Sequence, residues 1–359
     1  MKQKIGIFLR HPMLRDYRLL FGLWMLLAVV AALTKMHSHN NFLIFRGVFW
    51  HTWQEVSLFA EYPQEYFDVN HYGPFFSMVF APFAVVPEWL GLVLWCLVLT
   101  LFLWWAVRRS SMSRSQQVFI FWFCAHELLT ALFMQQFNIA IAAIILLAFF
   151  LFSRHKLRFL LSLMGWGVVL FALPMLISSP EYIVGQYQEW YECLTGKNDD
   201  NMFALHQNIS LLGMVRKISQ CATYSDLWLI GPGLLLFALP YLRLSQYKYA
   251  AFRQTLLASV LMFVVLFSTG SESSGYIIAL VGTVVWYTCV PWRRSRWDVA
   301  LMVLVFVLSS LSPSDLFPAY LRREFVQPYA LKALPVTLVW LKLCYEICTR
   351  DYAPKAAFR

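Results

Sequence analysis

The sequence predicts an all-helical protein that crosses a membrane many times. Apolar residues make up 60% of its 359 residues, charged residues only 13%, and the mean hydropathy is +0.60. A soluble protein carries about 25% charged residues. Several apolar runs approach the roughly 20 residues that a helix needs to cross a bilayer. Because nothing alternates with the period of a barrel strand, helices must satisfy the backbone in lipid. We expect one membrane domain over residues 1–359.

The first apolar run, 18–34, follows a basic flank at 1–17 that we expect in the cytosol. It leads to a first outer loop at 36–72. Apolar and aromatic residues in the first half of that loop have near-helical spacing, which predicts a helix lying in the membrane interface. Two apolar runs follow, 75–86 and 89–107, separated by a proline. The first is short for a crossing, so we expect a short or broken span here.

The remaining apolar runs predict spans that alternate in direction: 117–134, 139–152, 160–177, 227–242, 256–267, 276–290, 299–311 and 329–344. Together these runs make about ten or eleven membrane segments. A second outer region lies at 178–225. With this assignment the inner loops hold most Lys and Arg residues, as the positive-inside rule requires. The net charge of +10 therefore needs no nucleic acid, and both termini are expected in the cytosol.

Polar residues gather in the first outer loop, where residues 36–76 hold four carboxylates and four of the eight histidines. Asp68, Asn70, His71 and Tyr72 are nearest the next apolar run. A carboxylate beside imidazole and amide groups suits a general base that deprotonates an acceptor hydroxyl. A solvated acidic loop explains the same composition. The histidine spacing matches no strong metal pattern, so we expect neither a metal nor a cofactor.

A second polar group lies around the run 117–134. His126 and Glu127 are inside this run, and Gln136 and Asn138 lie just beyond it. Ionisable residues within a membrane are costly and normally face a cavity or a partner. The group therefore predicts either a polar pocket at the outer end of this span or a hydrogen bond between packed helices.

The second outer region supplies a third group, in which His206, Asn208 and Ser210 are followed by Arg216. A cation on the outer side opposes the positive-inside trend, and Arg can bind a phosphate through two parallel hydrogen bonds. We expect this group to bind substrate. The segment 268–276 places Glu272 among small hydroxyl residues, which fits a plain turn or a rim that faces the substrate.

Three segments, YGPFFSMVFAPFAVVP, QQFN and HQNISLLGMVRK, occur in an order that resembles glycosyltransferase family 87. The family has a Tyr-x-Pro-Pro motif, a Gly-Gln-x-Asn turn, and an Asn-Gln-Ser-Leu stretch with a following Arg at these places. The residues of this chain that match are Tyr72, Pro74, Gln136, Asn138, Asn208, Ser210 and Arg216. The resemblance covers roughly residues 18–290.

The resemblance implies a GT-C-like fold with its active site on the outer face of the cytoplasmic (inner) membrane. It implies transfer of a hexose, mannose-like, from a polyprenyl-phosphate donor to an acceptor hydroxyl on a glycan or lipid. The expected partners are this donor, this acceptor and membrane lipid, with no nucleic acid. The first outer loop would supply the catalytic carboxylate.

Two places depart from the family pattern. Asn41 stands where the family commonly has Asp, and an amide cannot act as a base. Asn41 is then a substrate-binding residue, and either Asp68 or Glu65 takes the catalytic role, or the chain is a non-catalytic member. A membrane unit is also missing between Asn138 and Arg154. A lipid-linked-sugar flippase or other transporter is a further alternative, although we see no internal repeat of the kind common in transporters.

Overall fold

The computed structural model describes residues 11–353, except for the side chains of residues 153–154 and 198–200. The helices are α2 (Tyr17–Thr34), α3 (Asn40–Gln54), α4 (Phe76–Ala84), α5 (Glu88–Arg109), α6 (Arg114–Phe123), α7 (Ala125–Phe133), α8 (Asn138–Arg154), α9 (Lys156–Ala172), α10 (Pro180–Asp200), α11 (Leu211–Ser219), α12 (Leu227–Ala238), α13 (Ala250–Leu266), α14 (Tyr276–Thr288), α15 (Arg296–Leu304), α16 (Ala319–Leu321) and α17 (Ala333–Thr349). Residues 11–353 contain no strand, so the all-helical prediction is confirmed. The first ten residues of the predicted flank 1–17 and residues 354–359 lie outside the described residues.

The core of the bundle is built around α14. Every residue from 276 to 286 is buried, as expected for a helix that is apolar on all sides. It packs against α13 most extensively, and also against α6, α7, α8 and α17. Gly282 permits the close approach of α13, because a Cβ there would lie 2.8 Å from the Cβ of Leu261. On the other side of the molecule, α2 packs along α5 and also contacts α6, where Trp24 donates a hydrogen bond to the carbonyl of Phe121 (2.9 Å).

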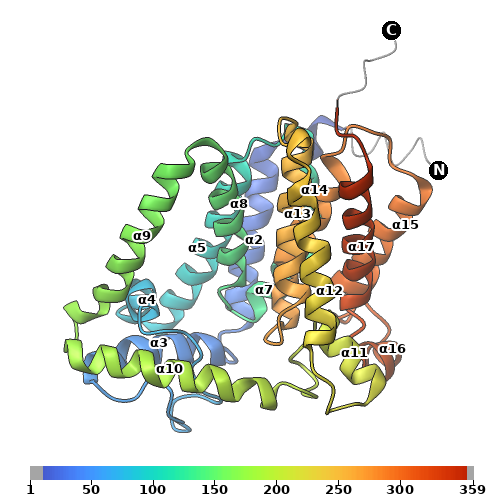
Figure 1. The fold of residues 1–359 in the computed structure, drawn as a ribbon. Coiled ribbons are helices and arrows are strands. Elements are labelled where there is room, and N and C mark those ends of the chain that lie inside the picture. The colour runs from blue at the N-terminus through green and yellow to red at the C-terminus, as the bar shows by residue number, and fades with distance from the viewer. Residues whose placement is uncertain (1–10, 354–359) are drawn as a thin grey trace.

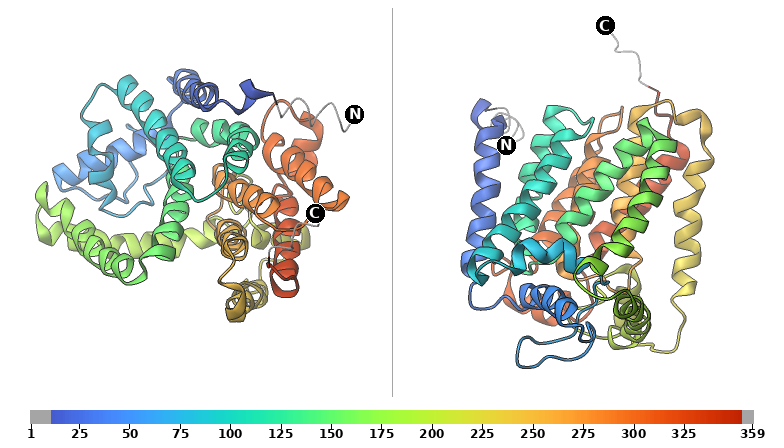
Figure 2. Two further views of the ribbon diagram at one scale, coloured as in Figure 1. Left: turned by 90° about the horizontal axis from the view of Figure 1, so that it is seen from above. Right: turned by 90° about the vertical axis from the view of Figure 1, so that its left-hand side faces the viewer.

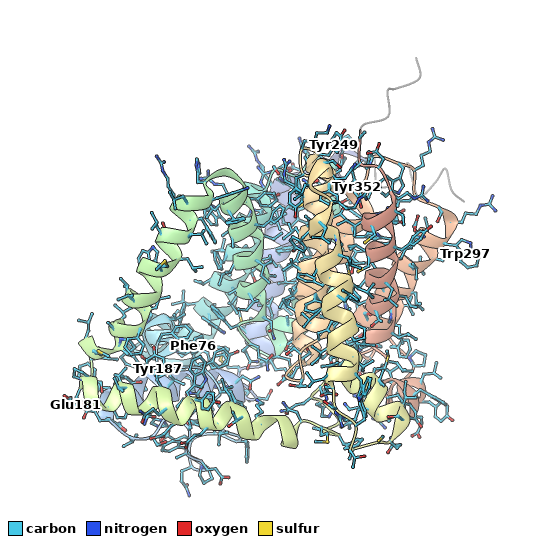
Figure 3. The ribbon with its side chains drawn as sticks, in the orientation of Figure 1. Phe76, Glu181, Tyr187, Tyr249, Trp297 and Tyr352 are labelled. Carbon is cyan, nitrogen blue, oxygen red and sulfur yellow. The ribbon has the colours of Figure 1, made fainter. Side chains whose placement is uncertain are left out.

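The bundle has two distinct ends (Figure 1). α2 begins and α17 ends at the upper end, whereas α3 and α10 lie across the lower end, and Figure 2 shows the same separation from the side. The predicted inner loops meet at the upper end. Arg114 donates to the carbonyl of Arg15 (2.9 Å), and Arg243 donates to the carbonyl of Ile347 (2.6 Å). In Figure 3, Tyr249 and Tyr352 mark the upper end, and Phe76 and Tyr187 the lower.

The short apolar run at 75–86 forms α4, which stays in the lower half of the molecule (Figure 1). It packs against α3 and α5 and does not reach the upper end. Gly91 permits the contact between α4 and α5, since a Cβ there would lie 2.4 Å from the carbonyl oxygen of Phe83. The expected short segment is thus a helix that begins and ends in the lower half. Of the two helices α4 and α5, only α5 runs to the upper end.

The predicted single span at 117–134 is two helices, α6 and α7, bent by 48°. The break lies at Cys124 and involves neither Pro nor Gly. By length and composition, α2, α5 and the helical segment Lys156–Leu176 could cross a bilayer, and the bent pair would make a fourth span. The apolar helices α8, α12, α13 and α14 are shorter. Within residues 11–353 the molecule is a polytopic helical membrane protein that combines long apolar helices with shorter ones.

One helix, α9, stands away from the bundle (Figure 1). None of its residues is buried, and Leu161, Met164 and Val168 are each more than 60% exposed. Its main neighbours are α8 and the short turn that leads to α10. Exposed apolar surface on every side of a helix suits contact with lipid.

Candidate active site

A cavity of about 750 Å³ opens in the lower half of the molecule, within the size range of small-molecule sites. It lies where the start of α3 and the end of α7 meet the segments 205–209, 272–273 and 312–332. Its polar lining residues are Asn41, Asp68, His126, Thr130, Gln136, His206, Gln207, Glu272, Ser273, Ser312, Ser314, Asp315, Gln327 and Lys332. Leu129, Phe133, Met134 and Leu205 are among its apolar lining residues.

Five residues that the sequence singled out line this cavity: Asn41, Asp68, His126, Gln136 and His206. They come from the first outer loop, from α7 and the turn after it, and from the second outer region. The structure therefore brings together the three polar groups that are far apart in the sequence. Their roles in substrate binding or catalysis stay predictions.

Asp68 is held at the cavity by the first residues of α3. The side chain of Asn40 donates to the carbonyl of Phe67 (2.8 Å) and accepts from its N–H (2.7 Å), while Asn41 donates to the carbonyl of Met134 (2.7 Å). Asp68 has a φ of 71°, which a short polar side chain tolerates. Its Oδ1 accepts from the N–H of Val69 (2.8 Å), and the side chain is exposed.

The turn after α7 is tied to the loop between α13 and α14. Oε1 of Gln136 accepts hydrogen bonds from Asn138 (2.8 Å) and from the hydroxyl of Ser274. Nε2 of Gln136 donates to Oε2 of Glu272 (2.6 Å). Asn138 also donates to Ser274 (3.0 Å). The Gln-x-Asn pair thus fixes the Glu272 carboxylate at the cavity, while Asn138 stands behind Gln136.

Glu127 does not line the cavity directly but forms a buried ion pair with Lys332, which does. The Lys332 ammonium donates to Oε1 of Glu127 (2.8 Å), and to both the carbonyl and the hydroxyl of Ser273 (2.9 Å each). His126, one residue away, bonds to the hydroxyl of Ser310 (3.1 Å). The sequence left open a polar pocket or a hydrogen bond between packed helices. His126 lines the polar cavity, whereas Glu127 joins packed elements through its ion pair with Lys332.

The other predicted residues of the first outer loop lie outside this cavity. Glu65 is 3.2 Å from Nε2 of His51. Asn70 is buried and exchanges hydrogen bonds with the backbone of Tyr72 (2.8 and 2.9 Å). The ring of Tyr72 stacks on Phe76, with centroids 4.4 Å apart.

His71 also lies outside the cavity and contacts α10. Its Nδ1 is 3.3 Å from the sulfur of Cys193, and its carbonyl accepts a hydrogen bond from Trp190 (2.8 Å). These contacts fasten the end of the loop between the bundle and α10. Of the two carboxylates proposed for catalysis, Asp68 alone faces the cavity.

The second outer region divides between the cavity and its support. His206 lines the cavity, whereas Asn208 and Ser210 are buried at the start of α11. Ser210 caps that helix by accepting from the N–H of Gly213 (3.0 Å) and donates to Asn208 (2.8 Å). Lys217 donates to the carbonyls of Ala204 (2.8 Å) and Gln207 (2.9 Å), which holds the segment that carries His206. Burial lowers the pKa of Lys217 to about 8.

Arg216 does not line the cavity that contains Asp68. It lines a separate cavity of about 530 Å³ that it shares with Asp226. Its guanidinium donates to Asp226 (2.6 Å) and to the carbonyls of Ala222 (2.8 Å) and Tyr224 (3.2 Å). Since these acceptors occupy the guanidinium, Arg216 fastens the connection between α11 and α12 and is not presented to a ligand of the main cavity.

Charge in the main cavity is mixed. Burial raises the pKa of Glu272 above its usual value, and the nearby charge of Asp68 raises it further. A hydrogen bond from Gln136 and the charges of Lys197 and His206 act in the opposite direction and lower this pKa. Among the residues that the structure describes, no group of three or more His, Cys, Asp or Glu side chains could hold a metal ion. The arrangement offers carboxylates, imidazoles and amides to a polar ligand.

Sequence reasoning gave no role to Lys332 and only an open one to Glu272. Lys332 had a partial signal, because it is one of two cations, with Lys342, in the last predicted span, 329–344, and Glu127 is the lone anion in the predicted span 117–134. Two such residues are expected to pair. Glu272 had a weaker signal, since a turn of small hydroxyl residues is compatible with an exposed carboxylate.

Comparison with known proteins identifies the family. The family model of glycosyltransferase family 87 matches residues 70–160 and 141–269, which together make up more than half of the chain. The two matched segments overlap at 141–160, in the region where the sequence is expected to lack a membrane unit. No curated protein and no solved structure matches significantly. The chain belongs to glycosyltransferase family 87 and is a membrane glycosyltransferase by family.

Proposed function

We propose that the protein transfers a mannose-like hexose from a polyprenyl-phosphate donor to an acceptor hydroxyl on the outer face of the cytoplasmic membrane. The observation that supports this most is the cavity of about 750 Å³ that gathers Asp68, His126, Gln136 and His206 at the end opposite the basic turns. Basic loops favour the cytoplasmic side, so the cavity would open outward. A lipid donor would reach it from the bilayer.

The chemistry requires a proton acceptor and support for the departing phosphate. A cavity carboxylate would take the proton of the acceptor hydroxyl, and Asp68 is the carboxylate that the sequence predicts for this role. Arg216 was the sequence candidate for the phosphate, but its guanidinium is bonded to Asp226 and backbone carbonyls. The imidazole of His206 lines the cavity wall and would approach the phosphate instead, since the donors of Lys332 are occupied by Glu127 and Ser273.

The proposal is tested with purified protein in liposomes. The donors to compare are a labelled polyprenyl-phosphate mannose, a polyprenyl-phosphate glucose and a nucleotide sugar, each with an alkyl mannoside as acceptor. Transfer from a polyprenyl-phosphate sugar, with none from the nucleotide sugar, supports the proposal. Movement of the labelled donor between leaflets without a glycoside product would identify a flippase. Absence of both activities would identify a non-catalytic member.

A further inference from the structure

The carboxylate of Glu272 lines the cavity, whereas a carboxylate in a plain surface turn would be fully exposed to solvent. The loop between α13 and α14 places it on the wall of the cavity, and the side chain is only partly exposed. Oε2 accepts a hydrogen bond from Gln136 (2.6 Å), and no hydrogen bond to Oε1 occurs among the described residues. One oxygen is therefore held by Gln136, and Oε1 has no hydrogen-bond partner among the described residues, on a side chain that lines the cavity.

The loop that carries Glu272 is held from three directions. Lys332 bonds Ser273 on one side, and Gln136 and Asn138 bond Ser274 on the other. The carbonyl of Ser271 accepts from the N–H of Ile209 (2.7 Å), which ties the loop to the segment that carries His206. A group whose neighbours are fixed in this way keeps its position when a substrate binds.

The charged groups that face Glu272 come from several elements. Asp68 on the first outer loop adds to the effect of burial and raises the pKa of Glu272, whereas Lys197 on α10 and His206 oppose it. A carboxylate with a raised pKa accepts a proton more readily than an ordinary one and still releases it near neutral pH. Asp68 differs, because it is exposed and its Oδ1 accepts a bond from Val69.

We infer that Glu272 is the catalytic base of the proposed glycosyl transfer, and that Asp68 binds the acceptor at the cavity opening. This rests on the proposed function. The acceptor O–H bond breaks and its proton passes to Oε1 of Glu272, while the acceptor oxygen forms a bond to the anomeric carbon. The bond between that carbon and the phosphate oxygen breaks, and its electron pair leaves with the polyprenyl phosphate. Glu272 then releases the proton to water.

The test compares Glu272→Gln with wild type, using polyprenyl-phosphate mannose and an alkyl mannoside. Loss of a general base lowers kcat by about 10²- to 10⁴-fold, and KM for the donor should stay the same. In wild type, kcat should fall as the pH drops through the raised pKa of Glu272, and residual transfer by Glu272→Gln should lack this dependence. Glu61→Gln, an exposed carboxylate of the same loop region as Asp68, serves as the control and should match wild type.

Other outcomes separate the alternatives. Full activity in Glu272→Gln, or an unchanged acid limb, overturns the inference while leaving the proposed function intact. A larger loss of kcat in Asp68→Asn than in Glu272→Gln would identify Asp68 as the catalytic base. If Glu272→Gln unfolds in detergent, Glu272→Asp decides: retained transfer with an acid limb supports the base, and activity without one contradicts it. A wild-type protein that uses no polyprenyl-phosphate sugar overturns the proposed function itself.

Discussion

The ammonium of Lys332 lies 2.8 Å from Oε1 of Glu127, and the two side chains are 4% and 0% exposed. This ion pair joins α7 to the start of α17, and Lys332 also bonds to Ser273 in the loop that carries Glu272. Desolvated charges are costly unless they are paired. The pair therefore stabilises the wall of the cavity as one unit.

Breaking this pair should destabilise the protein. Glu127→Gln leaves the Lys332 charge buried without its carboxylate, and such changes cost about 3–5 kcal/mol. Thermal unfolding in detergent measures the effect. The double variant Glu127→Leu/Lys332→Met removes both charges. Its loss of unfolding free energy should be smaller than the sum of the losses in the two corresponding single variants. Equal unfolding midpoints for wild type and Glu127→Gln would show that the pair contributes little.

A second prediction concerns the close approach of Gly213 to Asn208. A Cβ at Gly213 would lie 1.8 Å from the carbonyl oxygen of Asn208, so Gly213→Ala must displace the segment that carries His206. Overpacking of this kind costs about 1–3 kcal/mol. We expect a lower unfolding midpoint and weaker transfer. Gly185→Ala on α10, where a Cβ meets nothing within 4 Å, is the matched control and should not lower the midpoint.

A third prediction concerns the pH dependence set by Gln136. Its hydrogen bond to Glu272 favours the charged carboxylate and lowers that pKa. Gln136→Leu removes the donor, so the pKa of Glu272 should rise further and the acid limb of kcat should move to higher pH. A pH–rate profile of both proteins measures the shift. A shift to lower pH, or none, would contradict the assignment of that limb to Glu272.

A fourth prediction concerns Arg216, which was predicted from the sequence to bind phosphate. Its side chain is 5% exposed and pairs with Asp226 at 2.6 Å, so Arg216→Gln should lower stability by about 3–5 kcal/mol. The measurement is thermal unfolding, together with KM for the donor. An unchanged midpoint with a greatly raised donor KM would restore Arg216 as a phosphate ligand. Asp226→Asn is the companion variant and should also destabilise.

The sequence predicted the class of fold and the end of the molecule at which polar residues gather. Asp68, Gln136 and His206 lie in or beside segments on the same predicted side of the membrane, and alternating spans bring them together. Periodicity and hydropathy therefore locate residues along the membrane normal. They do not say which side chains of that layer face each other, which is why Glu65 was indistinguishable from Asp68.

Other features depend on tertiary contacts that leave no local signal. The bend at Cys124 occurs within a mostly apolar run that contains neither Pro nor Gly. The partner of Glu127 is Lys332, 205 positions away, and the sequence does not distinguish Lys332 from Lys342 in the same predicted span. Arg216 pairs with Asp226, ten residues further on, so its structural role was visible in principle, but the same sequence also fits a free cation.

In the proposed mechanism, a polyprenyl-phosphate sugar and an acceptor hydroxyl react in the cavity between Asp68 and Glu272. The most direct measurement is mass spectrometry of both products after purified protein is incubated in liposomes with polyprenyl-phosphate mannose and an alkyl mannoside. We predict a new disaccharide and free polyprenyl phosphate in equal amounts, and neither product with Glu272→Gln at short times. Disaccharide formation that consumes a nucleotide sugar, or that is equally fast in Glu272→Gln, would contradict the account.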